Sequence, residues 1–324
     1  MIYKLVLSLC FSLFLICQTQ AQLSRIFYPN VTLRAEYLPD ASMGTNQKYG
    51  LNRASFFAMM PIQSEVGVNY SLRRKFDLRA RHTFAVGNYA QINPTVNGKE
   101  TPANGYKSIS IGVVMLQASW KDKLWVYGGG LGMTETNETF FTPQPFLWGG
   151  AARMRIFGAQ SQLIYGTAFI YNQKFRVIPI IGFNKKLSPN WRASALLPFM
   201  LNFNYHPTGW YNFDFKATVN GYSGGFLQQA ATEKLLRRSN YQDIRLSAIA
   251  NVHLFTVLNI SLEGGVSAFR QLKDFNGVRE NISSNSPALV PFVGVSVRYI
   301  TSNAKISSAF MRKLGFGGDG GVNW

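Results

Sequence analysis

Cysteine is almost absent from this sequence of 324 residues: only Cys10 and Cys17 occur, both near the start. Residues 1–21 combine an early cation, an apolar run ending at Cys17 and a short polar stretch that closes on Ala21. That order is typical of a secretory signal peptide, and we expect cleavage after Ala21. The mature chain would then hold no cysteine, which excludes a disulfide framework or a small stapled domain.

Long apolar runs and acidic residues are scarce as well. Beyond residue 21, no stretch reaches the ~18 consecutive apolar residues that a membrane-spanning helix needs. Asp and Glu number 15, against 33 Lys and Arg. A basic excess often indicates nucleic-acid binding, but an exported chain does not routinely meet nucleic acid. We therefore expect membrane lipid, lipopolysaccharide and small anionic solutes as partners, and no nucleic acid.

Residues that carry chemistry are few, because the chain has only three histidines. Without cysteine or a cluster of His, Asp and Glu, the sequence supports no metal site. The triplet Gly128-Gly129-Gly130 is not followed by Lys-Ser/Thr, so it is not a phosphate-binding loop; close strand packing explains it better. We predict no cofactor and no enzymatic activity.

What the sequence has in abundance is alternation of apolar and polar residues with a period of two. The clearest segment, 211–220, places Tyr211, Phe213 and Phe215 on one face and Asn212 and Asp214 on the other. Many alternating segments run ~10–16 residues, which suits a tilted strand that crosses a bilayer. We predict an all-β fold over residues 22–300: a transmembrane antiparallel up-and-down β-barrel of the bacterial outer membrane, inserted by the barrel-assembly machinery. Residues 301–324 form a tail, either a last strand or a periplasmic segment.

The number of strands depends on how the connections are interpreted. Short turns and long polar segments alternate along the chain if 160–186 is one long strand, and this gives 12 strands within a range of 10–14. A turn at 172–174 would raise the number to 13, and a short strand near 306–312 to 14. Pro61 and Pro198 each stand inside a series of apolar residues at every second position, and the series continues in step past the proline. We therefore expect a kink or bulge at each proline within a single strand.

Aromatic residues make up 14% of the sequence, and many stand near the ends of the expected strands. Such residues favour the membrane–water boundary, so we expect them to form aromatic girdles. The set comprises Tyr37, Tyr70, Trp120, Trp125, Trp148, Tyr171, Trp191, Tyr205, Trp210 and Tyr299.

Basic residues stand at the positions that alternate with the apolar residues of each strand, which predicts a basic lumen. The candidate lumen-lining residues are Arg34, Arg79, Arg81, Arg153, Arg155, Lys216, Arg245 and Arg298. Fewer acids share this face, and unpaired cations in a narrow pore would favour anions. The alternative is that these charges fill a closed barrel as an internal salt-bridge network.

Two stretches resemble a known family. The run Asn190-Trp191-Arg192-Ala193-Ser194-Ala195-Leu196-Leu197-Pro198, continuing to Asn204-Tyr205, is similar to a pattern in uncharacterised outer-membrane β-barrels of Bacteroidota, a domain-of-unknown-function family. Residues 52–70 repeat a similar pattern within the chain. More distantly, the chain resembles the PorP/SprF-type membrane proteins of the type IX secretion system. The resemblance implies an outer-membrane barrel and no established activity.

Three functions follow from these features. The leading one is a narrow channel or solute-specific porin with a basic, anion-favouring lumen. The alternative is a structural or interaction barrel of an envelope or secretion assembly, and the third is an outer-membrane hydrolase. The hydrolase would need a serine beside His82, which we assign to the lipid-facing row with Ala80 and Phe84.

Overall fold

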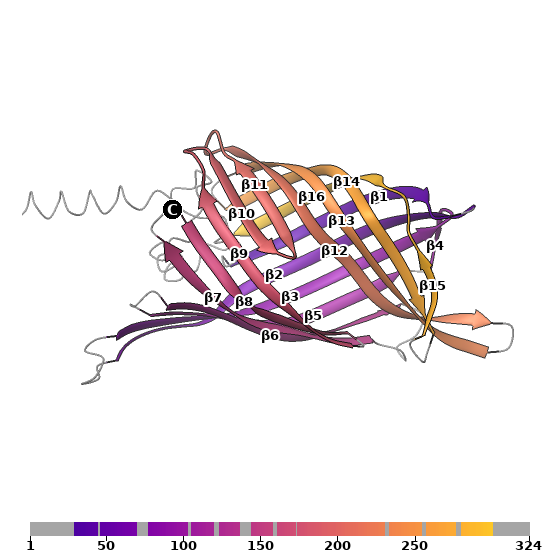
Figure 1. Ribbon diagram of the computed structural model, residues 1–324, viewed down its shortest axis with the longest axis horizontal. Coiled ribbons are helices and arrows are strands. Elements are labelled where there is room, and N and C mark those ends of the chain that lie inside the picture. The colour runs from indigo at the N-terminus through magenta and orange to yellow at the C-terminus, as the bar shows by residue number, and fades with distance from the viewer. Residues whose placement is uncertain are drawn as a thin grey trace, which may run out of the picture.

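In the computed structural model an antiparallel sheet closes on itself as a β-barrel (Figure 1). The structure describes residues 29–44, 46–69, 77–102, 105–119, 123–136, 144–157, 161–172, 174–230, 233–254, 257–276 and 280–300. The expected signal peptide and the expected tail at 301–324 therefore lie outside the described residues.

Fourteen strands form the ring within the described part of the chain, and each pairs with the next in sequence. They are β1 (Asn30–Ser42), β2 (Lys48–Asn69), β3 (Asp77–Val96), β5 (Tyr106–Ser119), β6 (Lys123–Thr136), β7 (Gln144–Phe157), β8 (Ser161–Asn172), β9 (Lys174–Lys186), β10 (Trp191–Leu197), β11 (Met200–Tyr205), β12 (Tyr211–Ala230), β13 (Glu233–Leu254), β14 (Leu258–Phe275) and β16 (Val290–Ile300). Pairing of β16 with β1 closes the ring. Two short strands, β4 (Lys99–Glu100) and β15 (Asn281–Asn285), pair with β3 and β14 outside it.

The predicted number of 12 strands is wrong, because two segments interpreted as single strands are hairpins. The chain reverses between Asn172 and Lys174, which separates β8 from β9. It reverses again between Leu196 and Met200, which separates β10 from β11 at the proline expected to be a kink. Fourteen strands is the upper end of the predicted range, although the short strand proposed near 306–312 lies outside the described residues. At Pro61, by contrast, β2 continues through the expected bulge, with a register shift before Gln63.

The two ends of the barrel differ. At the end called here the terminal end, Asn30 pairs with Ile300, and this end faces left in Figure 1. The opposite end, called here the hairpin end, carries the long β12–β13 hairpin, which stays paired to Ala230 and Glu233. The polar residues on either side of this turn therefore belong to β12 and β13.

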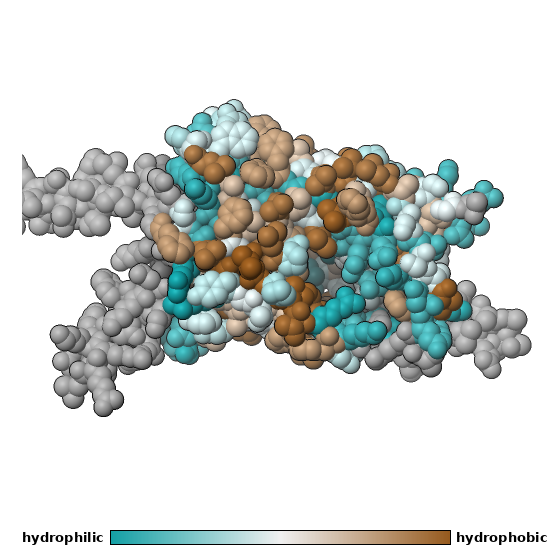
Figure 2. All heavy atoms as spheres, in the orientation of Figure 1, coloured by the Kyte–Doolittle hydropathy of each residue, from teal (hydrophilic) through white to brown (hydrophobic). Residues whose placement is uncertain are grey.

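A belt of exposed apolar side chains encircles the wall between these ends. Figure 2 shows part of it as brown residues over the wall, with hydrophilic residues gathered at the hairpin end. Its members include Leu33, Phe56, Ile111, Leu131, Leu147, Phe169, Val177, Phe203, Phe215, Leu246, Leu262 and Val295. A soluble protein rarely exposes so large a continuous apolar surface, whereas a barrel in lipid requires it. Among the described residues, no helix is long and apolar enough to cross a membrane.

The predicted alternation is confirmed in β1, β12, β14 and β16. In β12, for instance, Phe213 and Phe215 are exposed on the outside, while Asn212 and Asp214 are buried inside. In β14 the rows exchange faces between Ser267 and Arg270, at Phe269, which has a positive φ of 49° and stands 84% exposed at a register shift against β13. A β-bulge explains this exchange, since one extra residue inverts the parity of all that follow.

In β3 and β7 the predicted faces are inverted. Phe84, expected to face lipid, is 0% exposed and packs inside the barrel with Leu116, Leu124 and Met154. His82 lies on the same buried row. This apolar cluster fills the interior at the terminal end, so polarity there no longer distinguishes inside from outside. The assumption that the polar row faces inward fails for this physical reason.

Trp148 also points inward instead of joining a girdle, and glycines make room for it. A Cβ atom built on Gly112 or Gly130 would lie 2.5 or 2.7 Å from the indole Cζ2 atom. These glycines therefore allow a large ring to fill the lumen next to β5 and β6.

The orientation of β12 predicts unequal effects of a cation on its two faces. Phe215→Arg places a guanidinium in the apolar belt and should cost about 2–4 kcal/mol near the bilayer midplane. Thr218→Arg, on the inner face of the same strand, should be tolerated. Urea unfolding in phospholipid vesicles, read by heat-modifiable gel mobility, measures both. Equal losses for the two variants would contradict this orientation.

Candidate functional site

The eight cations expected to line the lumen separate into two groups. Arg34, Lys216, Arg245 and Arg298 lie on inward-facing rows of β1, β12, β13 and β16. Arg81, Arg153 and Arg155 instead alternate with buried inward residues and lie on the outer wall. The side chain of Arg79 is outside what the structure describes.

The outward placement of Arg153 and Arg155 corrects the prediction that they stack inside the barrel. Arg153 lies over the Trp125 ring at 5.9 Å from its centroid, and Arg155 lies over the Tyr165 ring at the same distance. Cation–π contacts of this kind suit the boundary between lipid and water, where a long side chain can keep its charge solvated. The basic residues of β7 therefore belong to the membrane boundary and not to the lumen.

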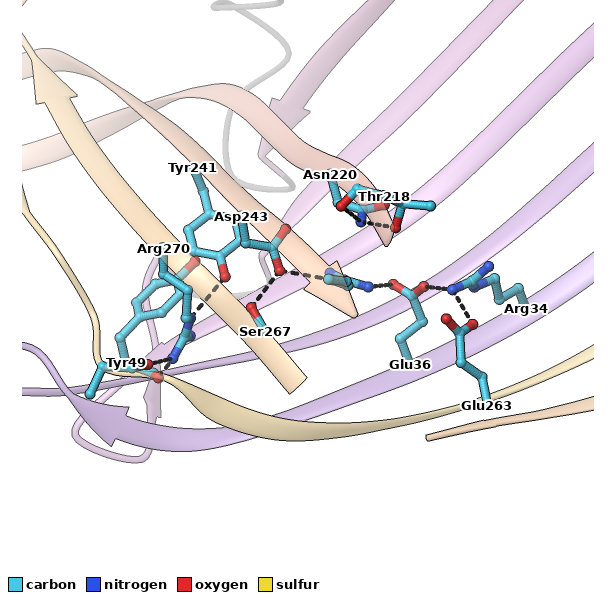
Figure 3. A network of polar contacts seen from close by, with 12 residues as sticks. Arg34, Glu36, Tyr49, Thr218, Asn220, Tyr241, Asp243, Glu263, Ser267 and Arg270 are labelled. Atoms are coloured by element: carbon cyan, nitrogen blue, oxygen red, sulfur yellow. Dashed lines mark hydrogen bonds and ion pairs between the residues drawn. The ribbon is translucent and has the colours of Figure 1, made fainter. Parts of the chain in front are cut away.

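Inside the barrel, five charged residues form a continuous chain of ion pairs, which we call the ion network: Asp243, Arg245, Glu36, Arg34 and Glu263 (Figure 3). Arg245 Nε donates to Asp243 Oδ2 at 2.9 Å, and Arg245 Nη1 reaches Glu36 Oε2 at 2.9 Å. Arg34 then bridges Glu36 to Glu263, with 2.6 Å between Nη2 and Glu263 Oε2. The network joins three strands, β1, β13 and β14, and its alternating charges compensate one another.

A tyrosine cluster closes the interior on the hairpin-end side of this network. Tyr49, Tyr222 and Tyr241 stack, with ring centroids 5.3 and 5.6 Å apart, and Tyr106 packs on Tyr222 at 5.4 Å. Arg270 lies over both Tyr49 and Tyr241 and donates to the Tyr241 hydroxyl at 2.9 Å (Figure 3). The rings of Tyr49, Tyr106 and Tyr241 are buried, so this part of the lumen is filled.

A second region of the interior remains hollow. A polar cavity of about 270 Å³ lies between β1, β10–β14 and β16. Its charged lining consists of Arg34, Asp214, Lys216, Glu263 and Arg298. Three cations against two acids give this cavity a basic excess.

The acids of the polar cavity already have partners. Asp214 accepts hydrogen bonds from the amides of Asn202, Asn204 and Asn251 at 3.2, 2.9 and 2.8 Å. Glu263 is held by Arg34. Among the described residues, Lys216 forms no direct ion pair, although Asp214 and Glu263 in the same lining act on its charge. This is a site where an anion would be attracted.

The wall beside this cavity is incomplete. The β10–β11 hairpin pairs with β9 only as far as Ile181 and with β12 only as far as Thr218. Beyond its tip at Pro198 and Phe199, both β9 and β12 continue toward the hairpin end, and no strand of the described part of the chain pairs between them. We call this gap the window; a cavity of about 500 Å³ occupies it. Figure 1 shows the short β10 and β11 beside the longer strands.

Sequence reasoning missed the window and the tyrosine cluster. The inward-facing alternate positions of three strands hold Tyr106, Tyr222 and Tyr241. The alternation of the sequence could therefore have distinguished these tyrosines from the residues of the aromatic girdles. The window has no comparable signal, because it depends on where pairing stops.

His82 has a neighbour that the sequence could not identify. Its Nδ1 lies 2.7 Å from the hydroxyl of Ser64 on β2. The lipid-facing assignment of His82 is wrong, since the ring is buried inside the barrel against Phe84. A serine and a histidine alone do not make a hydrolase, which also needs a group to orient the imidazole and donors for the oxyanion.

No protein-family model and no curated protein matches this chain. Solved structures with low similarity are the β-domain of the Bordetella autotransporter BrkA, the siderophore receptor PirA from Pseudomonas aeruginosa and the Pseudomonas putida toluene transporter TodX. BrkA is 9% identical, with a TM-score of 0.27, and the match covers 85% of this chain and 99% of that one. PirA is 9% identical, with a TM-score of 0.23, and the match covers 84% of this chain and 80% of that one. TodX is 7% identical, with a TM-score of 0.23, and the match covers 87% of this chain and 92% of that one. Such scores assign the chain to none of these groups.

The ion network predicts a large loss of stability when one member is removed. Glu36→Gln leaves Arg245 and Arg34 without their shared acid and should cost about 3–5 kcal/mol. The triple variant Glu36→Leu, Arg245→Met and Asp243→Asn removes Arg245 together with both of its acids, leaves Arg34 paired with Glu263, and should recover much of that loss. Urea unfolding of the barrel in vesicles, followed by tryptophan fluorescence, compares them. If the single and triple variants unfold alike, the network is not a coupled unit.

Proposed function

We propose that this protein is an integral barrel of the bacterial outer membrane that serves as a narrow, solute-specific passage favouring anions. The polar cavity with the unpaired Lys216 is the observation that carries the proposal. The apolar belt supports a membrane location, and the predicted export signal is consistent with the outer membrane.

The filled interior argues for a narrow passage and against a wide diffusion pore. The ion network fills the lumen next to β1, β13 and β14, and the tyrosine cluster fills it next to β2, β5, β12 and β13. The apolar cluster of Phe84 and Met154 occupies the terminal end next to β3 and β7. A route for solute would therefore run through the two remaining hollow regions, the window cavity beside β8, β9 and β12 and the polar cavity between β1, β10–β14 and β16.

These two cavities meet at the tip of the β10–β11 hairpin. Phe199 lines the window cavity, and Met200, the next residue, lines the polar cavity. On the facing strand, Asn220 lines the first and Lys216 the second. A small movement of the Phe199–Met200 step would connect them, so the tip is placed where a constriction would control passage.

Selectivity would follow from the charge balance in the polar cavity. Arg34 pairs with Glu263, and asparagine amides hold Asp214 in its charged form, so the lining keeps one more cation than it has acids. Cations on the wall of a narrow passage attract anions and repel cations. The proposed solute is therefore a small anion.

The second candidate is a structural or interaction barrel of an envelope assembly. Its support is the β12–β13 hairpin, which remains paired to Ala230 and Glu233 and extends past the ring in Figure 1. Such a projection offers a surface to a partner protein. Repeated purification of the barrel alone under mild detergent would speak against this candidate.

Lys216→Gln tests the proposed passage. Removing one cation at a distance of about 4 Å loses about 1 kcal/mol of attraction in water, so the anion-to-cation permeability ratio should fall roughly fivefold. Reversal potentials across planar bilayers under a salt gradient measure this ratio. The double variant Arg153→Gln/Arg155→Gln removes two cations from the outer wall and should leave the ratio unchanged. Cation preference of the unmodified barrel, or absence of conductance, would refute the passage.

A further inference from the structure

We propose that the window is a lateral binding site for a small amphiphile with one anionic head, which enters through the barrel wall near the edge of the apolar belt. The inference rests on the proposed function in one respect, that the interior of the barrel carries a solute. It adds the class of ligand and the direction from which the ligand arrives.

The first support is the interrupted pairing of two strands. Within the described ranges, segment 174–180 of β9 and the part of β12 beyond Val219 have no strand on the sides that face each other. At ~3.3 Å per residue, the unpaired stretch of β9 is roughly 20 Å long. Backbone groups in lipid must be hydrogen-bonded, so a gap in a membrane barrel has to be lined by water, ligand or a closing segment.

The second support is the chemistry of the lining. Ile170 and Ile178 point inward from β8 and β9, and Phe199 stands at the hairpin tip, so one part of the cavity is apolar. Lys174 and Arg176 are exposed on the inward row of β9, toward the hairpin end. Among the described residues, neither forms an ion pair. An apolar pocket with two adjoining free cations suits an apolar chain with an anionic head.

The position of the window gives the direction of entry. Phe175 and Val177, which flank Arg176 on β9, are exposed on the outer wall as part of the apolar belt. Lys174 lies at the end of the same strand, where the chain turns back to β8. A ligand whose chain lies in the belt would therefore meet the apolar lining first, with its head level with the two cations.

The lining also favours a small molecule over an added strand from a partner protein. The free edge of β9 carries Lys174, Arg176 and Pro179. Inward charges and proline are the features with which natural sheets protect exposed edges against strand pairing. The cavity volume of about 500 Å³ is that of a small-molecule site.

The experiment uses the full barrel in lipid nanodiscs and a photoactivatable analogue of dodecanoate, with labelled residues located by mass spectrometry. The expected result is labelling around the hairpin tip and segment 174–180, with competition by unlabelled dodecanoate. A two-chain anionic phospholipid bearing the same photogroup should label the apolar belt only. Preferential labelling of the window by the two-chain probe would overturn the assignment to a single-chain ligand.

Two pairs of variants separate the site from general lipid contact. Ile178→Trp fills the cavity, whereas Val177→Trp adds the same ring to the outer wall of the same strand. Labelling should fall in the first and persist in the second. Lys174→Gln/Arg176→Gln should weaken binding about tenfold, as expected for the loss of a charge-assisted hydrogen bond, while Arg153→Gln/Arg155→Gln should not. Equal labelling in Ile178→Trp and Val177→Trp would overturn the site.

Reversal potentials of the same variants distinguish this inference from the proposed function. If the barrel conducts anions but the probe labels only the apolar belt, the window site fails and the passage stands. If the probe labels the window in a barrel that does not conduct, the passage fails and the lateral site stands.

Discussion

Backbone hydrogen bonding in lipid is the constraint on which this structure depends. No water is available in the bilayer core to satisfy a free amide or carbonyl, so a sheet can cross it only as a closed ring. Pairing of β16 with β1 provides that closure. Once the ring is closed, each strand has one face toward lipid and one toward the lumen, and the period-two pattern of the sequence follows.

This constraint also explains which parts of the fold could be predicted. Directly paired residues of an antiparallel hairpin share a face. In some hairpins the residue numbers of each pair add up to an even number, as for Asn172 with Lys174 or Leu196 with Met200. The even-numbered residues of both strands then lie on one face of the sheet, and the odd-numbered residues lie on the other. Such a hairpin has the pattern of one long strand, and no run of Gly, Asn or Asp marks either turn. Where the sum is odd, as for Tyr211 with Val252, the parity exchanges and the hairpin is visible in the sequence.

The candidate site was predictable only in part, for a related reason. Alternation separates the two faces of a strand but does not say which face is inside. The polar row faces inward in β1 and β12, where the lumen holds ions and amides, and Arg34 and Lys216 lie on that row. In β7 the lumen is apolar, Met154 fills it, and Arg153 and Arg155 face the membrane boundary. Whether a strand lies next to a polar or an apolar part of the lumen decides which of its faces is inside. The sequence of one chain does not show which part of the lumen a strand will adjoin.

The interior therefore has regions with different physical roles. The ion network and the tyrosine cluster are compensated and packed, which makes them suited to fixing the register of β1, β13 and β14. At the window the lining lacks such compensation: Lys174 and Arg176 form no ion pair among the described residues, and the wall stops at the β10–β11 tip. Uncompensated charge and unpaired strand edges are both costly in a membrane unless something occupies the space they leave. Since the two coincide in one region, occupancy by a solute accounts for both with a single cause, whereas a purely structural barrel would have to explain each separately.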